Sequence, residues 1–141
     1  MCYGPSTMTG PTIEFHLDAG SGLPPYQQLV RQVRHALRLG LLREGDQLPT
    51  VKDVVAHLAI NPNTVLKAYR ELEHDRLVAA RPGIGTFVTR TLTDATFAAH
   101  GPLRQDLLRW LAKARRAGLD DESIEALFMT TFRTAAQEDV A

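Results

Sequence analysis

The sequence lacks several features that would place it in large classes of proteins. A single cysteine, Cys2, cannot form an internal disulfide, so we expect an intracellular, cytoplasmic protein. No uncharged apolar run approaches the roughly 18–20 residues that a membrane span needs, and we expect no membrane partner. Residues 1–12 lack a basic start followed by an apolar run, which argues against a secretory signal. With 141 residues, the chain is long enough for one compact domain and an appendage.

The chain also has no net charge, but the charges are unevenly distributed. Sixteen Lys and Arg residues balance sixteen Asp and Glu residues. Residues 1–23 carry a net charge of −2, residues 24–90 carry +4, and residues 91–141 carry −2. A basic middle between acidic ends keeps a nucleic-acid partner possible, although a charge surplus alone is a weak signal.

Chemically reactive residues do not form a recognisable catalytic or metal site. The five histidines are scattered, and His57 is expected to be structural because it lies near the apolar side of a helix. Cys2 has no fixed base nearby, and no Lys-Ser/Thr pair follows the glycines at 83 and 85. Residues 120–122 are acidic, which is typical of a helix start and favours that interpretation over a metal site. We predict no enzymatic activity, no metal and no cofactor.

The first quarter of the chain predicts a disordered leader, a strand and a helix. Residues 1–12 are rich in Gly, Pro, Ser and Thr, as disordered segments are. Apolar and polar residues alternate over residues 13–18, which predicts a short strand with one apolar face. Pro24 and Pro25 open an amphipathic basic helix that Gly40 ends.

Two short helices follow a connector at residues 41–49. Thr50 occupies an N-cap position before the first helix, which ends near Ala59. Asn61 and Pro62 start the second helix as N-cap and first helical residue. One side of this helix holds Val65, Ala68, Tyr69, Leu72 and Arg76. This arrangement predicts a helix-turn-helix.

A hairpin and a helical tail complete the predicted architecture. Residues 78–80 and 86–89 are β-prone and flank a glycine-bearing loop, which predicts a hairpin and hence a winged helix. Residues 91–93 are a predicted linker. Apolar residues then recur at helical spacing up to Gly118 and again after Asp120. The fold class is therefore mainly α with a small β wing: a winged helix-turn-helix at 13–90 and a two-helix unit at 94–141.

The start of the second helix of the helix-turn-helix has the side chains that reading DNA requires. Short polar groups at that end can reach base edges in the major groove, and Asn61, Asn63 and Thr64 lie there. Lys67 and Arg70 follow on the same face, where phosphates are the expected partners. Alone, these two cations would be an ordinary solvated face. Together with the wing and the Asn-Pro-Asn-Thr start, they favour double-stranded DNA as the partner.

Several motifs in order make the chain resemble a known family. The stretch from Leu48 to Glu73, the Arg81-Pro-Gly-Ile-Gly-Thr-Phe-Val wing and Pro25-Tyr-Gln-Gln-Leu are similar to the GntR family of bacterial winged-helix regulators. The Asn61-Pro-Asn-Thr-Val segment, with Ala68-Tyr69 and a short helical tail, resembles its YtrA-like branch. The resemblance covers residues 13–90 tightly and residues 94–137 only in length and helical pattern.

The resemblance implies a repressor that binds a palindromic operator as a homodimer and responds to a small effector, and it suggests control of transporter genes. The effector site cannot be assigned from these residues. The candidate DNA contacts are Thr50, Lys52, Asn61, Asn63, Thr64, Lys67, Arg70, Arg81 and Gly83. Three positions depart from the usual family residues: Lys52 replaces an arginine, Leu66 a polar or basic residue, and Ile84 a frequent wing lysine.

The helical tail is the predicted dimerisation surface. Its large apolar residues are too many for two helices that pack on one small domain. The alternative is that they fold back on the winged helix of their own chain. The competing function is a winged-helix module used only for protein contacts. The residues predicted to form the dimer are Leu107, Trp110, Leu111, Leu127, Phe128 and Phe132.

Overall fold

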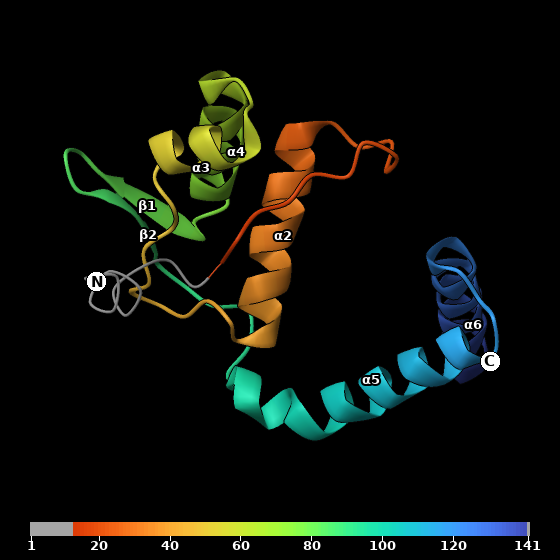
Figure 1. Ribbon diagram of the computed structural model, residues 1–141. Coiled ribbons are helices and arrows are strands. Elements are labelled where there is room, and N and C mark those ends of the chain that lie inside the picture. The colour runs from red at the N-terminus through yellow and green to blue at the C-terminus, as the bar shows by residue number, and fades with distance from the viewer. Residues whose placement is uncertain (1–12, 141) are drawn as a thin grey trace, which may run out of the picture. The chain divides into compact units, whose positions relative to one another are not determined.

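The computed structural model describes residues 13–140, which divide into two compact units (Figure 1). The first unit ends at Ala98 and the second begins at Ala99. The predicted leader at residues 1–12, including Cys2, lies outside the described residues. No helix within residues 13–140 is long and apolar enough to cross a membrane.

Helix α2 (Pro25–Leu39) is the central element of the first unit. It begins with Pro25, and it buries Leu29, Val33 and Leu37 completely. It ends at Gly40, whose φ of 79° is left-handed, as predicted. A Cβ at Gly40 would lie 2.5 Å from the Ala95 carbonyl oxygen, so the close approach of that backbone also requires glycine.

Helices α3 (Val51–Leu58) and α4 (Pro62–His74) form the predicted helix-turn-helix. Thr50 Oγ1 accepts a hydrogen bond from the Asp53 backbone N–H at 3.1 Å. Asn61 Oδ1 accepts one from the Asn63 backbone N–H at 2.8 Å. Both N-caps are confirmed, because each side chain satisfies a backbone donor that the first helical turn leaves free.

The end of α4 corrects one expectation about which residues share one side of this helix. The four apolar members of the predicted set are buried, but Arg76 is exposed and lies beyond the helix with a φ of 62°. The Leu77 N–H donates to the Leu72 carbonyl at 3.0 Å, and the Arg76 N–H donates to the Glu73 carbonyl at 2.9 Å. These bonds turn the chain out of the helix before Arg76 can join its apolar face.

Strands β1 (Val78–Arg81) and β2 (Gly85–Val88) pair antiparallel as the predicted wing. Figure 1 shows this hairpin projecting from the helices of its unit. The segment before α3, expected to be only a connector, also pairs with β2. The Leu48 N–H donates to the Thr86 carbonyl and the Val88 N–H to the Asp46 carbonyl, both at 2.8 Å. The wing is therefore fixed on one side by the chain that leads into α3.

Residues 13–18 do not form the predicted strand, but their apolar side packs on the core as predicted. Phe15 is only 3% exposed, yet the segment has no partner strand among residues 13–140. The Gln32 side chain bonds instead to the backbone N–H and carbonyl of His16, at 3.1 and 2.8 Å. The buried Gln28 does the same for Asp18, at 2.8 and 3.0 Å. Side-chain amides thus satisfy the backbone groups that a neighbouring strand would have satisfied.

One hydrophobic core unites the first unit. It joins the N-terminal segment, the three helices and the wing through side chains that are almost fully buried. Its largest fully buried members are Leu29, Leu37, Leu42, Leu48, Leu72, Leu77, Val33 and Val65. Because all these elements share one core, the helix-turn-helix and the wing keep a fixed relation to each other.

The second unit consists of helices α5 (Gly101–Arg116) and α6 (Asp121–Val140), after a short 3-10 helix, η1 (Phe97–His100). Asp120 caps α6 as predicted, because its Oδ1 accepts the Ser123 backbone N–H at 2.9 Å. Hydrogen bonds from the Ser123 side chain and backbone lower the pKa of Asp120. Among the apolar side chains of residues 101–138, only Ala114 and Ile124 are buried.

Candidate nucleic-acid interface

Helix α4 separates its apolar and polar side chains onto opposite sides. Val65, Ala68 and Leu72 are completely buried in the core of the first unit. The predicted DNA-facing side chains of the same helix, Asn63, Lys67 and Arg70, are exposed, and Thr64 is half-buried at the first turn. Packing on the core therefore presents the polar side of α4 to solvent.

The two N-cap residues, Asn61 and Thr50, have a structural role that limits the hydrogen bonds their side chains can offer to DNA. Asn61 Oδ1 already accepts the Asn63 N–H, which uses one of its two acceptor lone pairs, whereas its amide nitrogen makes no hydrogen bond within residues 13–140. Thr50 Oγ1 likewise accepts the Asp53 N–H. The Asn63 side chain is exposed and has no hydrogen bond within residues 13–140. It can thus offer both its donor and its acceptor to a base edge.

Lys67 is held by an aromatic ring that the sequence argument did not connect to it. Its Nζ lies 4.0 Å from the centroid of the Tyr26 ring, at the start of α2. The Tyr26 hydroxyl in turn accepts a hydrogen bond from Gln27 Nε2 at 3.1 Å. A cation over a ring face is favourable by about 0.5–1 kcal/mol at an exposed site. Tyr26 therefore orients the ammonium group beside the polar side of α4.

Tyr69 connects α4 to the start of α3. Its hydroxyl donates to the Pro49 carbonyl at 2.6 Å, one residue before the Thr50 cap. Burial raises the pKa of Tyr69 above its ordinary value, and the Asp53 carboxylate raises it further. The hydroxyl therefore stays protonated and keeps donating. Through this bond, Thr50 and the exposed Lys52 are positioned relative to α4.

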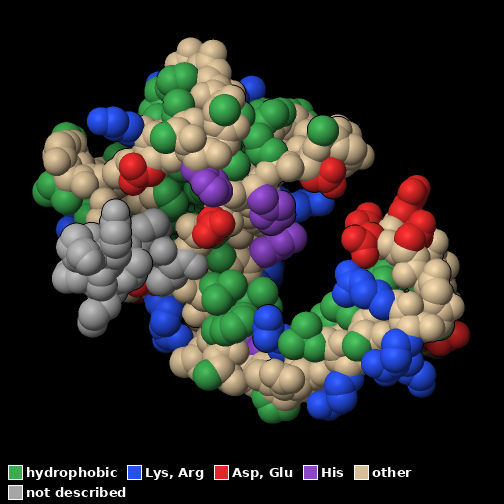
Figure 2. All heavy atoms as spheres, in the orientation of Figure 1, with side chains coloured by type: hydrophobic (Ala, Val, Ile, Leu, Met, Phe, Trp, Pro, Cys, Tyr) green, Lys and Arg blue, Asp and Glu red, His purple; other side chains and the backbone are tan. Residues whose placement is uncertain are grey.

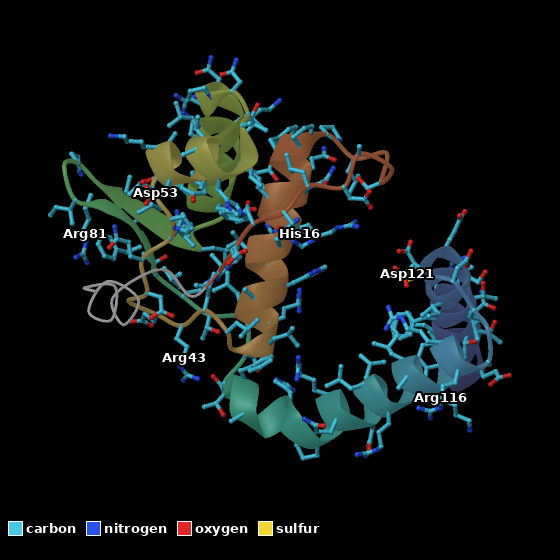
Figure 3. The ribbon with its side chains drawn as sticks, in the orientation of Figure 1. His16, Arg43, Asp53, Arg81, Arg116 and Asp121 are labelled. Carbon is cyan, nitrogen blue, oxygen red and sulfur yellow. The ribbon has the colours of Figure 1, made fainter. Side chains whose placement is uncertain are left out.

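Glu73 joins α4 to the wing. Its carboxylate accepts the Ala80 backbone N–H of β1 at 3.1 Å. On the same strand, the Arg81 guanidinium lies 4.7 Å from the centroid of the Phe87 ring on β2. Figure 3 shows Arg81 on the hairpin. Gly83 lies at the turn with a φ of 77° and open space around it.

All nine predicted DNA contacts lie in the first unit, at the start of α3, along α4 and on the wing. Tyr69 links α4 to the start of α3, Glu73 links α4 to the wing, and Tyr26 holds Lys67 from α2. Nothing in the spacing of the sequence identified their contacts, since each joins positions that are not neighbours on one element. The roles of the nine residues toward DNA stay predictions.

A second basic surface lies along α2, away from the start of α4. Arg31, Arg34, His35 and Arg38 line a groove between α2 and α4 together with Glu71. Arg34 forms an ion pair with Asp75, whereas Arg38 is exposed in the last turn of α2. Because a helix rises 1.5 Å per residue, Arg38 lies roughly 18 Å along the axis from Tyr26.

The predicted dimerisation residues form an apolar surface on the second unit. Phe132 is 62% exposed, and Leu107, Leu127 and Phe128 are 43–46% exposed. The rings of Phe128 and Phe132 stack with centroids 6.0 Å apart. Trp110 lines a groove with these α6 side chains, and Leu111 lines the adjoining one.

Among the remaining titratable side chains, Glu14, Asp53 and His57 line one pocket of the first unit. Within residues 13–140, no three His, Cys, Asp or Glu side chains are placed to hold a metal ion together. His57, expected near the buried side of α3, is 55% exposed and lies 3.9 Å from Glu14 Oε1. The short helix rotates it toward solvent because Val54 occupies the position facing the core.

Comparisons with known proteins agree with this geometry. Residues 25–88 match the family described as bacterial regulatory proteins, gntR family. The chain is 30% identical over 112 residues to the HTH-type transcriptional repressor YtrA of Bacillus subtilis (strain 168), covering 77% of this chain and 84% of the relative. It is 44% identical over 84 residues to the HTH-type transcriptional regulator Rv1152 of Mycobacterium tuberculosis, covering 59% of this chain and 69% of that relative.

The same architecture occurs among solved structures. A transcriptional antiterminator from Listeria monocytogenes EGD-e superposes with a TM-score of 0.54 and 27% sequence identity, over 85% of this chain and 90% of that one. The resemblance thus extends past the helix-turn-helix and wing.

Proposed function

The chain belongs to the GntR family of bacterial regulatory proteins, and from this premise we propose that it is a transcriptional repressor that binds a palindromic DNA operator as a homodimer. The observation that carries the proposal is the polar side of α4, which is exposed while its opposite side is locked into the core. The family consists of regulatory proteins, and no enzymatic activity belongs to the proposal. A cytoplasmic location, beside the chromosome, goes with it.

In this proposal the candidate contacts divide into two groups. Asn63 and Thr64 read base edges, because they lie in the first turn of α4 and Asn63 has a free amide. The cations bind phosphates, which hold the protein in register without reading sequence. Lys67 suits this role because Tyr26 fixes its ammonium group before DNA arrives. The residues that we assign to contacts with the sugar-phosphate backbone of DNA are Thr50, Lys52, Asn61, Lys67, Arg70, Arg81 and Gly83.

The second unit supports the dimer through its apolar surface and its charges. Seven large hydrophobic side chains of α5 and α6 are more than 40% exposed. In sequence, α5 has five Lys and Arg residues and one Asp, whereas α6 has five acidic residues and one Arg. Figure 2 shows basic side chains along α5 and acidic ones over α6. Opposite charges around apolar surfaces suit the pairing of α5 from one copy with α6 from another.

A two-fold dimer also explains why the operator would be palindromic. Two identical α4 helices related by a two-fold axis would meet identical half-sites in opposite orientation. We therefore assign residues 13–90 to DNA binding, 91–93 to a linker and 94–141 to dimerisation. The resemblance to the YtrA-like branch further supports a small-molecule effector that releases the repressor, and transporter genes as its targets.

The test uses a duplex that the protein selects from a random-sequence library, beside a scrambled duplex. Binding is measured by fluorescence anisotropy at several salt concentrations. Asn63→Ala should lower affinity for the selected duplex by ~1–3 kcal/mol per half-site and leave the scrambled duplex nearly unchanged. Arg70→Ala should weaken both duplexes equally and reduce the salt slope by about one per contact.

Arg38→Ala is the matched control, because it removes the same charge from the surface of α2 that lies away from the start of α4. It should change neither affinity nor slope beyond the small effect of overall charge. Equal weakening of both duplexes by Asn63→Ala would show that the α4 tip does not read bases. If the unaltered protein selects no duplex, it is a protein-interaction module instead.

A further inference from the structure

The polar side of α2 carries positive charge only. Four basic side chains repeat there at three- and four-residue steps and so share one side of the helix: Arg31, Arg34, His35 and Arg38. Residues 25–39 include no Asp or Glu. Arg31, His35 and Arg38 are exposed, and none of them has a hydrogen-bond or ion-pair partner within residues 13–140. Their donors are therefore free to bind an anion from solution.

These side chains border a groove between α2 and α4. The groove has a volume of about 330 Å³, and Val30, which is only 5% exposed, lies among its lining residues. Pockets for small ligands start at about 300 Å³, so the groove has room for a small molecule. A DNA backbone fits it poorly, because the carboxylates of Glu71 and Asp75 on the α4 side would repel a continuous row of phosphates.

The groups in the groove indicate the chemistry of its ligand. The planar donor forks of Arg31 and Arg38 match the oxygens of a phosphate group, and their long side chains can converge on one such group. Glu71 can only accept hydrogen bonds. Gln27 donates to the Tyr26 hydroxyl, which leaves its side-chain oxygen as a second acceptor. A ligand that satisfies both sets of groups carries a phosphate and, beside it, hydroxyl groups that donate.

Arg34 connects the groove to the elements that carry the predicted DNA contacts. Its guanidinium forms an ion pair with the carboxylate of Asp75, the C-cap residue of α4. The Asp75 carbonyl also accepts a hydrogen bond from Arg90 Nη2, just beyond β2, at 3.4 Å. A phosphate in the groove would compete with Asp75 for Arg34, because both anions bind the same donors. The empty and the occupied groove thus differ in how α2 holds the junction of α4 and the wing.

We propose that this groove binds a small organic phosphate that carries hydroxyl groups, such as a sugar or polyol phosphate, and that this ligand is the effector that releases the protein from DNA. The effector role rests on the proposed function, whereas binding of the phosphate does not. When Arg34 turns to the phosphate, the end of α4 loses its ion pair to α2. DNA favours the state in which α4 and the wing are held together, so the ligand and DNA oppose each other.

The first experiment measures ligand binding without DNA, by calorimetry and NMR on the full-length protein. The probes are glycerol phosphate, inorganic phosphate and glycerol. Glycerol phosphate should bind more tightly than inorganic phosphate, and glycerol should not bind. The NMR shifts should centre on residues 27–38 and 71–75. Arg31→Ala and Arg38→Ala should each lower the affinity by about tenfold, as expected for the loss of a charge-assisted hydrogen bond.

Arg104→Ala is the matched control for both variants. It removes an arginine of α5 that is also exposed and without a hydrogen-bond or ion-pair partner in the described part of the chain. It should leave the affinity for glycerol phosphate unchanged. Because all three arginines are exposed, the variants should melt at the same temperature as the unaltered protein, which separates loss of binding from loss of fold.

The second experiment measures the effector role by anisotropy on the selected duplex. Saturating glycerol phosphate should weaken binding of the unaltered protein by about fivefold or more, the lower end of typical coupling between two sites. Arg38→Ala should bind the duplex normally without the ligand and should no longer respond to it. This variant also controls for the ionic strength that the ligand adds.

The two parts of the proposal fail separately. If the unaltered protein selects no duplex, the proposed function and the effector role both fall, and the phosphate site is judged by calorimetry alone. If no phosphate binds, or if the three arginine variants lose affinity alike, the groove is not a ligand site. If Arg31→Ala and Arg38→Ala weaken the selected duplex when no ligand is present, these arginines bind DNA instead, and the proposal is wrong. A phosphate that binds in the groove but leaves duplex affinity unchanged would contradict the effector role.

Discussion

The two compact units of this protein treat their apolar side chains in opposite ways. In the first unit, six leucines and two valines are less than 2% exposed within one core. In the described part of the second unit, seven large hydrophobic residues are more than 40% exposed, and only Ala114 and Ile124 are buried. The first unit is complete within one chain, whereas the second leaves the surface that we assign to a second copy.

The two units also differ in how far along the chain their side-chain hydrogen bonds reach. In the first unit they join distant positions, as from Tyr69 to Pro49 and from Gln32 to His16. The side-chain bonds of α5 and α6 stay local, as between Arg109 and Asp106 or between Arg115 and Asp121. Figure 3 places Arg116 and Asp121 at the turn between these helices. Long-range contacts specify a tertiary fold, whereas local ones stabilise helices that still need something to pack on.

The largest expected effect comes from a substitution in the apolar surface of the second unit. Phe128→Asp should convert the dimer to monomer, because it puts a carboxylate into an apolar interface. Loss of the two-site attachment should then lower operator affinity by about 10²-fold or more. Multi-angle light scattering and anisotropy measure the two effects.

The matched control is Thr130→Asp, which adds the same charge to the opposite side of α6. It should leave the protein dimeric. A Phe128→Asp variant that remains dimeric would mean that α6 packs within its own chain.

The next effect compares one leucine from each unit. Leu72→Ala should lower the free energy of unfolding by ~2–5 kcal/mol, because it leaves a cavity in a closed core. Leu127→Ala should have a smaller effect that shrinks as protein concentration rises, since mass action restores the dimer. Urea denaturation at low and high protein concentration distinguishes the two. If the destabilisation of both variants depended on protein concentration in the same way, the second unit would not differ from the first in needing a second copy.

An intermediate effect concerns Tyr69 in the first unit. Tyr69→Phe should lower the free energy of unfolding by about 1–2 kcal/mol, because the Pro49 carbonyl loses its donor. The folded state raises the pKa of Tyr69 above 10.0, so its contribution is complete below pH 10.0 and declines above it. The stability difference between the two proteins should therefore narrow in urea titrations above pH 10.0. A constant difference across this range would show that the hydroxyl does not titrate with unfolding.

The smallest effect concerns Asp120 in the second unit, at acid pH. The folded state lowers the pKa of Asp120 below 3.8, so its contribution is present above pH 3.8 and is lost as pH falls through the lower folded value. Asp120→Asn keeps a cap but cannot titrate. On acidification, circular dichroism should show that the unaltered protein loses helix at a slightly higher pH than the variant does. Identical acid profiles would mean that this cap does not limit α6.

Local chemistry was enough to predict most elements and the family. Thr50 and Asn61 predicted the starts of α3 and α4, because an N-cap depends only on the residues of the next turn. Gly40 predicted the end of α2 for a similar reason. By contrast, alternation at residues 13–18 predicted a strand, but the described part of the chain offers it no partner strand, since pairing depends on what lies beside a segment in space.

The sequence by itself determined the end of α2, the starts of α3 and α4, the wing and the set of polar residues on α4, because caps, turns and periodicity act over a few residues. Only the tertiary structure decided how these parts are held: Tyr26 under Lys67, Glu73 bonded to β1, and Gln47 fixing the wing tip. It also decided which apolar residues are covered and which remain exposed. Contacts between distant positions form only when the core closes, and their geometry is set by packing rather than by spacing along the chain.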